Sequence, residues 1–263
     1  MTEWPDSLRG INQLPDHEKE AIYRTLLPEW LFHTFQIDPN TLTAEGKRVV
    51  HFRCPGGSRA VEIIVRRRAD DLDPLLYLNM ADTFNNQLQV LLIVVNNPDA
   101  PRYDIDIDPA GRNTHLATTG RNLAAEEAAM KAGLAPGQVR AGLRIFRQSL
   151  PQFETFVEHM GHNMYIVEPM AYHNAIIFER YGFSYMKGRR EMVAIDQAFQ
   201  PGGELHARLN EESVFRPPDA WRSVRGRSWA IHDGILGHPY TGVQMYKIVG
   251  QTFDVNTFPN GVW

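Results

Sequence analysis

The sequence has few of the features that mark secreted and membrane proteins. Its 263 residues include one cysteine, Cys54, so no disulfide can form within the chain, as is typical of a reducing compartment. The longest purely aliphatic run, residues 90–95, is far shorter than the roughly 20 residues that a membrane-spanning helix needs. The N-terminal segment MTEWPDSLRG has no basic region followed by an apolar run, which predicts no signal peptide. We therefore expect a cytoplasmic protein that does not enter a membrane, with Cys54 as a small buried residue.

The chain also lacks a strong excess of either charge. It carries 27 Lys and Arg against 31 Asp and Glu, a net charge of −4, whereas proteins that bind nucleic acids usually present a basic surface. We expect no nucleic-acid partner and a small-molecule substrate instead. The apolar share of 43% is ample for a core, and the length suits one large domain or two small ones.

Hydrophobic periodicity predicts an α/β protein. Residues 16–35 have helical spacing, suited to core packing or to the arm of a homodimer. Residues 49–54 and 60–66 are strand-like and flank Pro55-Gly56-Gly57-Ser58, a strong hairpin signal. Residues 75–80 are a further candidate strand. Residues 88–96, the most apolar segment, predict a central strand.

The segment YDIDID at residues 103–108 alternates strictly between apolar and acidic residues. As a strand it would place Ile105 and Ile107 on one face and Asp104, Asp106 and Asp108 on the other. Such an acidic face is either exposed to water, or it binds cations or takes part in a proton transfer. The row therefore supplies candidate acid–base residues.

Residues 164–192, MYIVEPMAYHNAIIFERYGFSYMKGRREM, predict a strand, a helix and a second strand. Residues 164–167 are an apolar run, and residues 171–181 carry apolar side chains at helical spacing. Gly182 follows as a helix stop, because glycine accepts the left-handed conformation that a helix end often needs.

This stretch resembles the C-terminal half of the GCN5-related N-acetyltransferase (GNAT) superfamily. The best match to the family's helix, roughly N-x-x-A-x-x-x-Y-E-x-x-G-F, is FERYGF at residues 178–183. The resemblance implies a GNAT-like fold, a mixed and mostly antiparallel sheet flanked by helices. We expect a helical N-terminus, a domain over residues 1–193 with an insert near 109–136, and a C-terminal extension, residues 194–263, packed on the same domain.

The resemblance further implies an enzyme that transfers an acyl group from acetyl-CoA, or another acyl-CoA, to an amine. Asp106 or Asp108, on the strand corresponding to the family's fourth, would be the general base. The pantetheine arm would run beside residues 164–167, including Ile166, with Asn174 nearby. The family's pyrophosphate loop, Q/R-x-x-G-x-G/A at a helix N-terminus, would correspond to residues 138–142: Gln138, Val139, Arg140, Ala141 and Gly142.

Two departures from the family pattern bear on activity. The family's tyrosine, which protonates the departing thiolate, corresponds to Phe178, and a phenylalanine has no proton to give. Tyr172, Tyr181 and Tyr185 are the alternative acids, of which Tyr172 is our candidate. The loop has only one of the family's glycines at the expected position. A GNAT-like domain that binds a ligand without catalysis is therefore an alternative function.

The ten histidines suggest a third alternative. His173, His232 and His238, with the aspartate row, provide residue types that bind zinc, and they would suit a metal-dependent enzyme or binding protein. The sequence has no HExxH or HxH signature. The competing interpretation is that these histidines cap helices or lie in the core and on the surface, with no metal bound.

Overall fold

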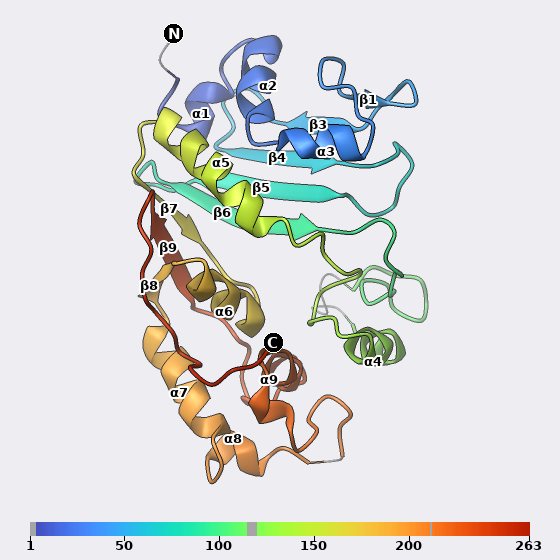
Figure 1. Ribbon diagram of the computed structural model, residues 1–263, viewed down its shortest axis with the longest axis vertical. Helices are drawn as coiled ribbons and strands as arrows, with labels where there is room; N and C mark the ends of the chain where they lie inside the picture. The colour runs from blue at the N-terminus through green and yellow to red at the C-terminus, as the bar shows by residue number, and fades with distance from the viewer. Residues whose placement is uncertain (1–3, 115–119, 211) are drawn as a thin grey trace. The chain divides into compact units, whose positions relative to one another are not determined.

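The computed structural model describes residues 4–114, 120–210 and 212–263. They form a mixed α/β structure with a mostly antiparallel seven-stranded sheet flanked by helices, which confirms the predicted fold class (Figure 1). The strand order is β3-β4-β5-β6-β7-β9-β8. The strands are β3 (Val50–Arg53), β4 (Ala60–Val65), β5 (Leu76–Asp82), β6 (Leu88–Val95), β7 (Met164–Val167), β8 (Ser184–Lys187) and β9 (Gln244–Ile248), and β1 (Thr43–Ala44) pairs separately with β2 (Lys47–Arg48).

The chain divides into two compact units whose segments interleave. The first unit contains the chain through Asp99, Gly142–Glu168 and Tyr246–Gln251. Its helices are α1 (Leu8–Ile11), α2 (Asp16–Arg24), α3 (Glu29–Thr34) and α5 (Phe146–His159). The boundary that we expected between residues 193 and 194 falls inside a helix of the second unit, α7 (Arg189–Phe199).

The second unit comprises Ala100–Ala141, Pro169–Met245 and Thr252–Trp263. The insert expected near residues 109–136 lies in its first segment. Besides α7, the unit contains α4 (Leu123–Lys131), α6 (Tyr172–Arg180), α8 (Glu204–Ala207), the 3-10 helix η1 (Ala220–Arg222) and α9 (Val224–His232).

The strands of the first unit follow the sequence pattern closely. β3 and β4 pair antiparallel across the predicted turn, and β4, β5 and β6 continue the antiparallel meander. β6 is the fourth of the seven strands, so the most apolar segment is central, as predicted. Cys54 is buried with 6% of its surface exposed, and burial raises the pKa of its thiol.

The strand–helix–strand prediction for the stretch that begins at Met164 is confirmed by β7, α6 and β8. Gly182 ends the helical stretch with φ of +79°. A Cβ added there would lie 2.6 Å from Cγ2 of Thr252, so the position excludes a side chain sterically as well. Phe178 is buried, and its ring centroid lies 5.0 Å from that of Phe183.

The prediction of a strand over residues 103–108 is wrong. Ile105 and Asp106 lie in a turn, and Ile107 forms a single bridge with Asn113. The alternation has another cause, because Ile105 packs in a small core with Ala129 and Leu134. The backbone groups of this segment bond to loops and side chains of the same unit instead of to a neighbouring strand.

Among the described residues, no helix combines the length and the apolar character needed to cross a membrane.

Candidate functional site

The parallel pair β6–β7 in the first unit is unusually short for the length of β6. The two strands pair only from Leu88 to Val90, opposite Tyr165 to Val167. β7 then ends, while β6 continues for five residues: Leu91 lies at a β-bulge without a partner in β5, and Leu92 to Val95 remain paired with β5 on the other side. Residues 91–95 therefore have one edge that no strand in the described chain covers, and we call it the open edge of β6.

The open edge of β6 combines apolar side chains with backbone donors and acceptors. Leu91 is 37% exposed, and the four aliphatic residues after it are half-buried, although the strand is central in the sheet. The N–H of Asn96 donates to the carbonyl of Leu75, the residue before β5. Because backbone groups alternate in direction along a strand, those of Val95 and Ile93 face away from β5. Consistent with this, a Cβ added at Gly142 would lie 3.1 Å from the carbonyl oxygen of Val95.

A carboxylate lies where the two strands part. Glu168 follows β7 directly, is exposed, and accepts a hydrogen bond from Nε2 of Gln89 at 3.4 Å. The last ladder pair is Val90 with Val167, so Glu168 is the first residue beyond the paired region. No local sequence pattern marks Glu168, because only the register of the parallel pair places it there.

The start of α5 is basic and has no side-chain cap. The helix begins at Phe146 after Ile145, whose side chain cannot accept a hydrogen bond. Arg144 and Arg147 flank this start and are exposed, and Arg144 has φ of +57°. The first N–H groups of a helix lack partners within it and favour anions, so this end of α5 suits a phosphate group.

The predicted pyrophosphate loop, residues 138–142, does not open a helix. The helix starts later than predicted, at Phe146. The side chain of Gln138 accepts from the N–H of Ala135 at 2.8 Å, the carbonyl of Val139 accepts from the N–H of Tyr103 at 2.8 Å, and Nη1 of Arg140 donates to the carbonyl of Ala100 at 2.5 Å. These groups hold the loop itself in place, and nothing in its geometry forms a phosphate nest.

The aspartates of the predicted acidic row are paired with nearby arginines. Both carboxylate oxygens of Asp106 accept from Nη2 of Arg102, at 2.9 and 2.7 Å, and Asp104 is bonded to the same guanidinium. Asp108 accepts from the backbone and side chain of Arg112, and these bonds hold the pKa of its carboxyl below its usual value. A carboxylate with a lowered pKa is a weak base, so Asp108 is poorly suited to deprotonate an amine. The carboxylate of Asp106 is engaged by Arg102 through both of its oxygens.

The other predicted cofactor residues lie on β7 and α6. Ile166 is buried in β7, and Asn174 is half-buried in the first turn of α6. Tyr172, the candidate acid, is the first residue of α6 and is 1% exposed. Burial, partly offset by the charge of Arg227, raises the pKa of Tyr172 to about 12, so its hydroxyl is protonated at neutral pH.

The three histidines of the metal-site alternative have separate partners. His173 lies 2.8 Å from the hydroxyl of Ser228 through Nδ1, His232 donates to Glu126 at 3.3 Å, and the exposed His238 contacts the carbonyl of Pro239. In the described part of the chain, no three His, Cys, Asp or Glu side chains gather as ligands for a metal ion. Burial, with a smaller effect of His232, lowers the pKa of His173 to about 4, so His173 is neutral at pH 7.

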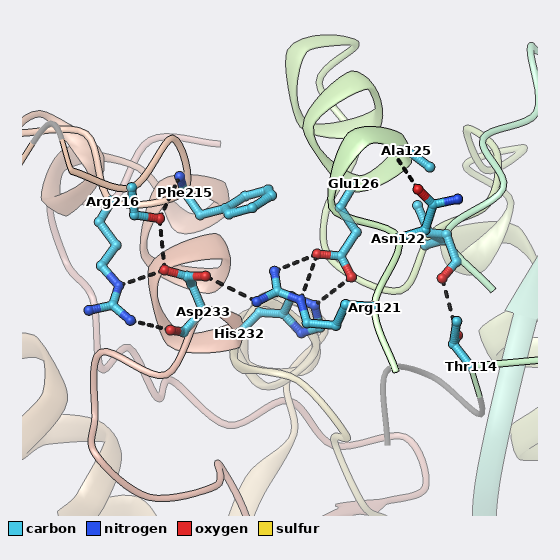
Figure 2. A network of polar contacts seen from close by, with 11 residues as sticks. Thr114, Arg121, Asn122, Ala125, Glu126, Phe215, Arg216, His232 and Asp233 are labelled. Carbon is cyan, nitrogen blue, oxygen red and sulfur yellow. Dashed lines mark hydrogen bonds and ion pairs between the residues drawn. The ribbon is translucent and has the colours of Figure 1, made fainter. Parts of the chain in front are cut away.

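A polar network in the second unit links the 121–126 segment to the end of α9 (Figure 2). Nε of Arg121 donates to Glu126 at 2.9 Å, and its Nη1 donates to Asp233 at 3.0 Å. Asp233 also accepts from Nε of Arg216 at 2.7 Å and from the hydroxyl of Ser213 at 2.8 Å. The network fixes the position of the C-terminal end of α9.

Glu126 is the buried acid of this network. It is 2% exposed, and burial alone raises the pKa of such a carboxyl. Hydrogen bonds and charge from His232 and Arg121 outweigh that effect, so the pKa of Glu126 lies below its usual value. The carboxylate is therefore ionised and fully paired, and its charge is neutralised locally.

A cavity of about 640 Å³ lies beside this network, within the second unit. Its wall comes from the start of α6, the last turn of α9 and the loop that follows α9. The lining residues are Pro136, Met170, Ala171, Tyr172, Ser228, Ile231, His232, Gly234, Gly237, His238, Pro239 and Tyr240.

Comparison with known proteins gives no relative. No protein-family model matches the chain, and no curated protein or solved structure matches it significantly. The resemblance to the GNAT superfamily therefore stays a prediction.

Proposed function

We propose that this protein binds an acyl-CoA along the open edge of β6 and transfers the acyl group to an amine. One observation carries the proposal: the parallel strands β6 and β7 separate after three residue pairs, while the apolar β6 continues with one edge uncovered. An acyl-pantetheine arm is an extended chain with amide groups. It can pair with Ile93 and Val95 as an added strand does and cover the exposed aliphatic side chains.

The start of α5 provides the phosphate site in this proposal. Gly142 lies beside Val95, at the end of the open edge, and α5 begins four residues later. The first turn of α5, with Arg144 and Arg147, supplies N–H donors and two positive charges to a pyrophosphate. This position replaces the loop at residues 138–142, whose polar groups are engaged elsewhere.

Glu168 is the proposed base. The amine nitrogen attacks the thioester carbonyl carbon, its proton passes to the Glu168 carboxylate, and the C–S bond breaks to release the thiolate, which takes up a proton. General-base assistance typically contributes about 10²–10⁴-fold to a rate. Phe178 is buried and has no proton to donate to the thiolate, so the chain uses another donor or water for that step.

Calorimetry with acetyl-CoA, combined with hydrogen exchange, tests the binding step. We expect saturable binding and slower amide exchange in a peptide that covers residues 91–96. A peptide from β4 serves as the internal control, because that strand is already paired on both edges. No heat at millimolar acetyl-CoA, or protection spread equally over both peptides, would contradict the proposal.

Charge reversal distinguishes the two phosphate positions. Arg144→Glu and Arg147→Glu place negative charge at the start of α5 and should weaken acetyl-CoA binding at least roughly tenfold, since each loses a charge-assisted contact. Arg140→Glu is the matched control, and it should bind acetyl-CoA as the unmodified protein does. Loss of binding in Arg140→Glu alone would instead place the pyrophosphate at residues 138–142.

Release of free thiol in the presence of a panel of amines tests the transfer step. We expect Glu168→Gln to retain acetyl-CoA binding and to lose at least roughly 100-fold in rate. Binding without turnover on any amine would favour a non-catalytic binding domain, the function that Phe178 in place of the family's tyrosine also favours.

A further inference from the structure

A cavity of about 330 Å³ on the β3–β4 hairpin is a second candidate site, within the first unit. It shares no residue with the open edge of β6. Three arginines and a histidine line it, against a single glutamate from α2, so its wall is mainly basic. The described lining residues are Glu20, Arg48, His51, Phe52, Arg53, Ile64 and Arg66.

The register of the hairpin brings three of the basic side chains to one face of the sheet. His51 in β3 lies opposite Ile64 in β4, and residues directly opposite each other share a face. Residues two apart on one strand also share a face, which adds Arg53 to His51. Arg66 follows Ile64 by two positions, and its N–H still donates to the carbonyl of Val49 in the ladder direction. His51, Arg53 and Arg66 therefore converge.

Arg66 supplies a positive charge that no acid balances. It is half-buried, and its Nε donates to the backbone carbonyl of Asp71 at 3.1 Å. Within the described chain it forms no ion pair, and neither Nη atom donates to another residue. The other two arginines of the wall each have one glutamate as a partner, with N–O distances of 2.8 and 3.2 Å. The wall thus has a net positive charge, and the guanidinium of Arg66 is available to a ligand.

The free edge of β3 adds a backbone donor. β3 is the first strand in the order of the sheet, so β4 is its only partner among the described strands. The bond from Arg66 to Val49 sets the alternation, in which the backbone groups of His51 point towards β4 and those of Phe52 point away from it. Phe52 lines the cavity, so its N–H is a donor at the edge that the ligand can reach.

His51 responds to the positive charge of this wall. Its side chain is half-buried, and burial lowers the pKa of the imidazole. The charges of Arg48 and Arg66 lower the pKa further, because they disfavour another cation nearby. His51 is therefore neutral at pH 7, and one of its ring nitrogens carries a proton that it can donate to an anion.

We propose that this cavity binds a small phosphorylated molecule through its phosphate monoester group. The Nη groups of Arg66, the N–H of Phe52 and the ring of His51 donate to the phosphate oxygens. A phosphate monoester carries close to two negative charges at neutral pH and three strong acceptor oxygens, which suits donors that converge from several elements. Phe52 and Ile64 provide apolar surface for the body of the ligand.

Ligands that share one ring and differ in their head group test this proposal on the full-length protein. Phenyl phosphate should bind saturably in calorimetry and raise the melting temperature. Benzoate should bind at least roughly tenfold more weakly, because it has one charge and two oxygens. Benzylamine, a cation, should not bind.

Arginine variants locate the binding. Arg66→Ala should weaken phenyl phosphate binding at least roughly tenfold, as expected for the loss of charge-assisted hydrogen bonds. Arg68→Ala is the matched control, because it removes the same charge two positions away from an arginine that lies outside the cavity and 3.7 Å from Glu45. This control should bind phenyl phosphate as the unmodified protein does.

Histidine variants provide a test that does not depend on the bond between Arg66 and Asp71. His51→Glu places a negative charge in the cavity and should abolish binding by repulsion, whereas the neutral His51→Gln should retain it to within roughly threefold. Melting curves without ligand show whether each variant is folded.

The proposal is overturned if phenyl phosphate does not bind at 10 mM (~100-fold above a modest Kd of about 0.1 mM), or if benzoate binds as tightly. Equal affinity in Arg66→Ala and Arg68→Ala, or in His51→Glu and His51→Gln, would also overturn it, because the ligand would then lie elsewhere.

The two proposed phosphate sites are tested independently. Arg144→Glu, which changes the start of α5, should leave phenyl phosphate binding unchanged, and Arg66→Ala should leave acetyl-CoA binding unchanged. Loss of phenyl phosphate binding in Arg144→Glu alone would place this ligand at α5 and overturn the inference. Failure of acetyl-CoA to bind would contradict only the proposed function.

Discussion

His173 shows how burial changes the chemistry of a single residue. Its imidazole is 4% exposed, and its pKa of about 4 lies well below the 6.5 of a free histidine. The hydroxyl of Ser228, 2.8 Å away, is its neutral partner. Folding therefore requires the uncharged ring, and the protein must exclude a proton that the unfolded chain takes up in mild acid.

The stability of the protein should consequently fall between pH 6.5 and pH 4. In that window the unfolded chain binds the proton and the folded chain does not, so acid favours unfolding, by up to about 3 kcal/mol. In His173→Asn the fall should be smaller, whereas in His33→Gln, which changes an exposed histidine, it should equal that of the unmodified protein. Denaturant melts across this pH range measure the slope. Identical slopes in all three proteins would show that another group dominates.

Single residues of the sites were the hardest feature to read from the sequence. His232 and Glu126 are separated by 106 positions, and Arg121 and Asp233 by 112, so no local pattern joins them. Glu168 is selected only by where β7 stops pairing. The aspartates were conspicuous because they alternate with apolar residues, yet that pattern reflects Ile105 packing in a small core.

At the scale of elements, sequence patterns succeeded where one local rule dominates. The Pro-Gly-Gly-Ser turn predicted the β3–β4 hairpin, and Gly182 predicted the end of α6. Sequence patterns failed where the structure depends on residues far away in the chain. Residues 103–108 alternate as a strand does, but they pair with no neighbouring strand. The start of α5 was placed too early, because the residues after Gly142 remain non-helical up to Ile145.

Substitution of Phe178 tests which face of α6 is buried. Its side chain is buried against Phe183, so Phe178→Ala should destabilise the protein by roughly 3–5 kcal/mol, the usual cost of emptying an aromatic core site. Phe84→Ala is the matched control, since Phe84 is 98% exposed, and it should change stability by less than about 0.5 kcal/mol. Equal melting curves for the two variants would mean that the buried face of α6 is misassigned.

For the whole molecule, the interleaving of the two units matters more than any boundary in the sequence. The first unit depends on residues near the C-terminus. Lys247 is 3.6 Å from Glu154, whose other oxygen accepts from the N–H of Gly250 at 3.1 Å. The N–H of Val249 donates to Asn163 at 2.9 Å. Composition alone could not predict that Tyr246–Gln251 belong to the first unit.

A fragment of residues 1–193 should therefore fail to fold cooperatively. It contains most of the first unit but lacks β9, which lies between β7 and β8 in the sheet. We expect a broad thermal transition, poor dispersion of amide resonances and strong binding of a hydrophobic dye, compared with a sharp transition for the full chain. A fragment that melts as sharply as the full chain would show that the C-terminal segment is dispensable.

The position of β9 also determines when the sheet can be completed during translation. β8 ends at Lys187, and β9 begins at Gln244, near the C-terminus. At ~5–20 residues per second, the ribosome leaves β7 and β8 without the strand that separates them for a time on the order of seconds. During that interval the nascent chain has exposed strand edges, which are templates for aggregation. A chaperone that shields nascent chains should thus raise the soluble yield of this protein, and slowing translation after residue 187 should lower it.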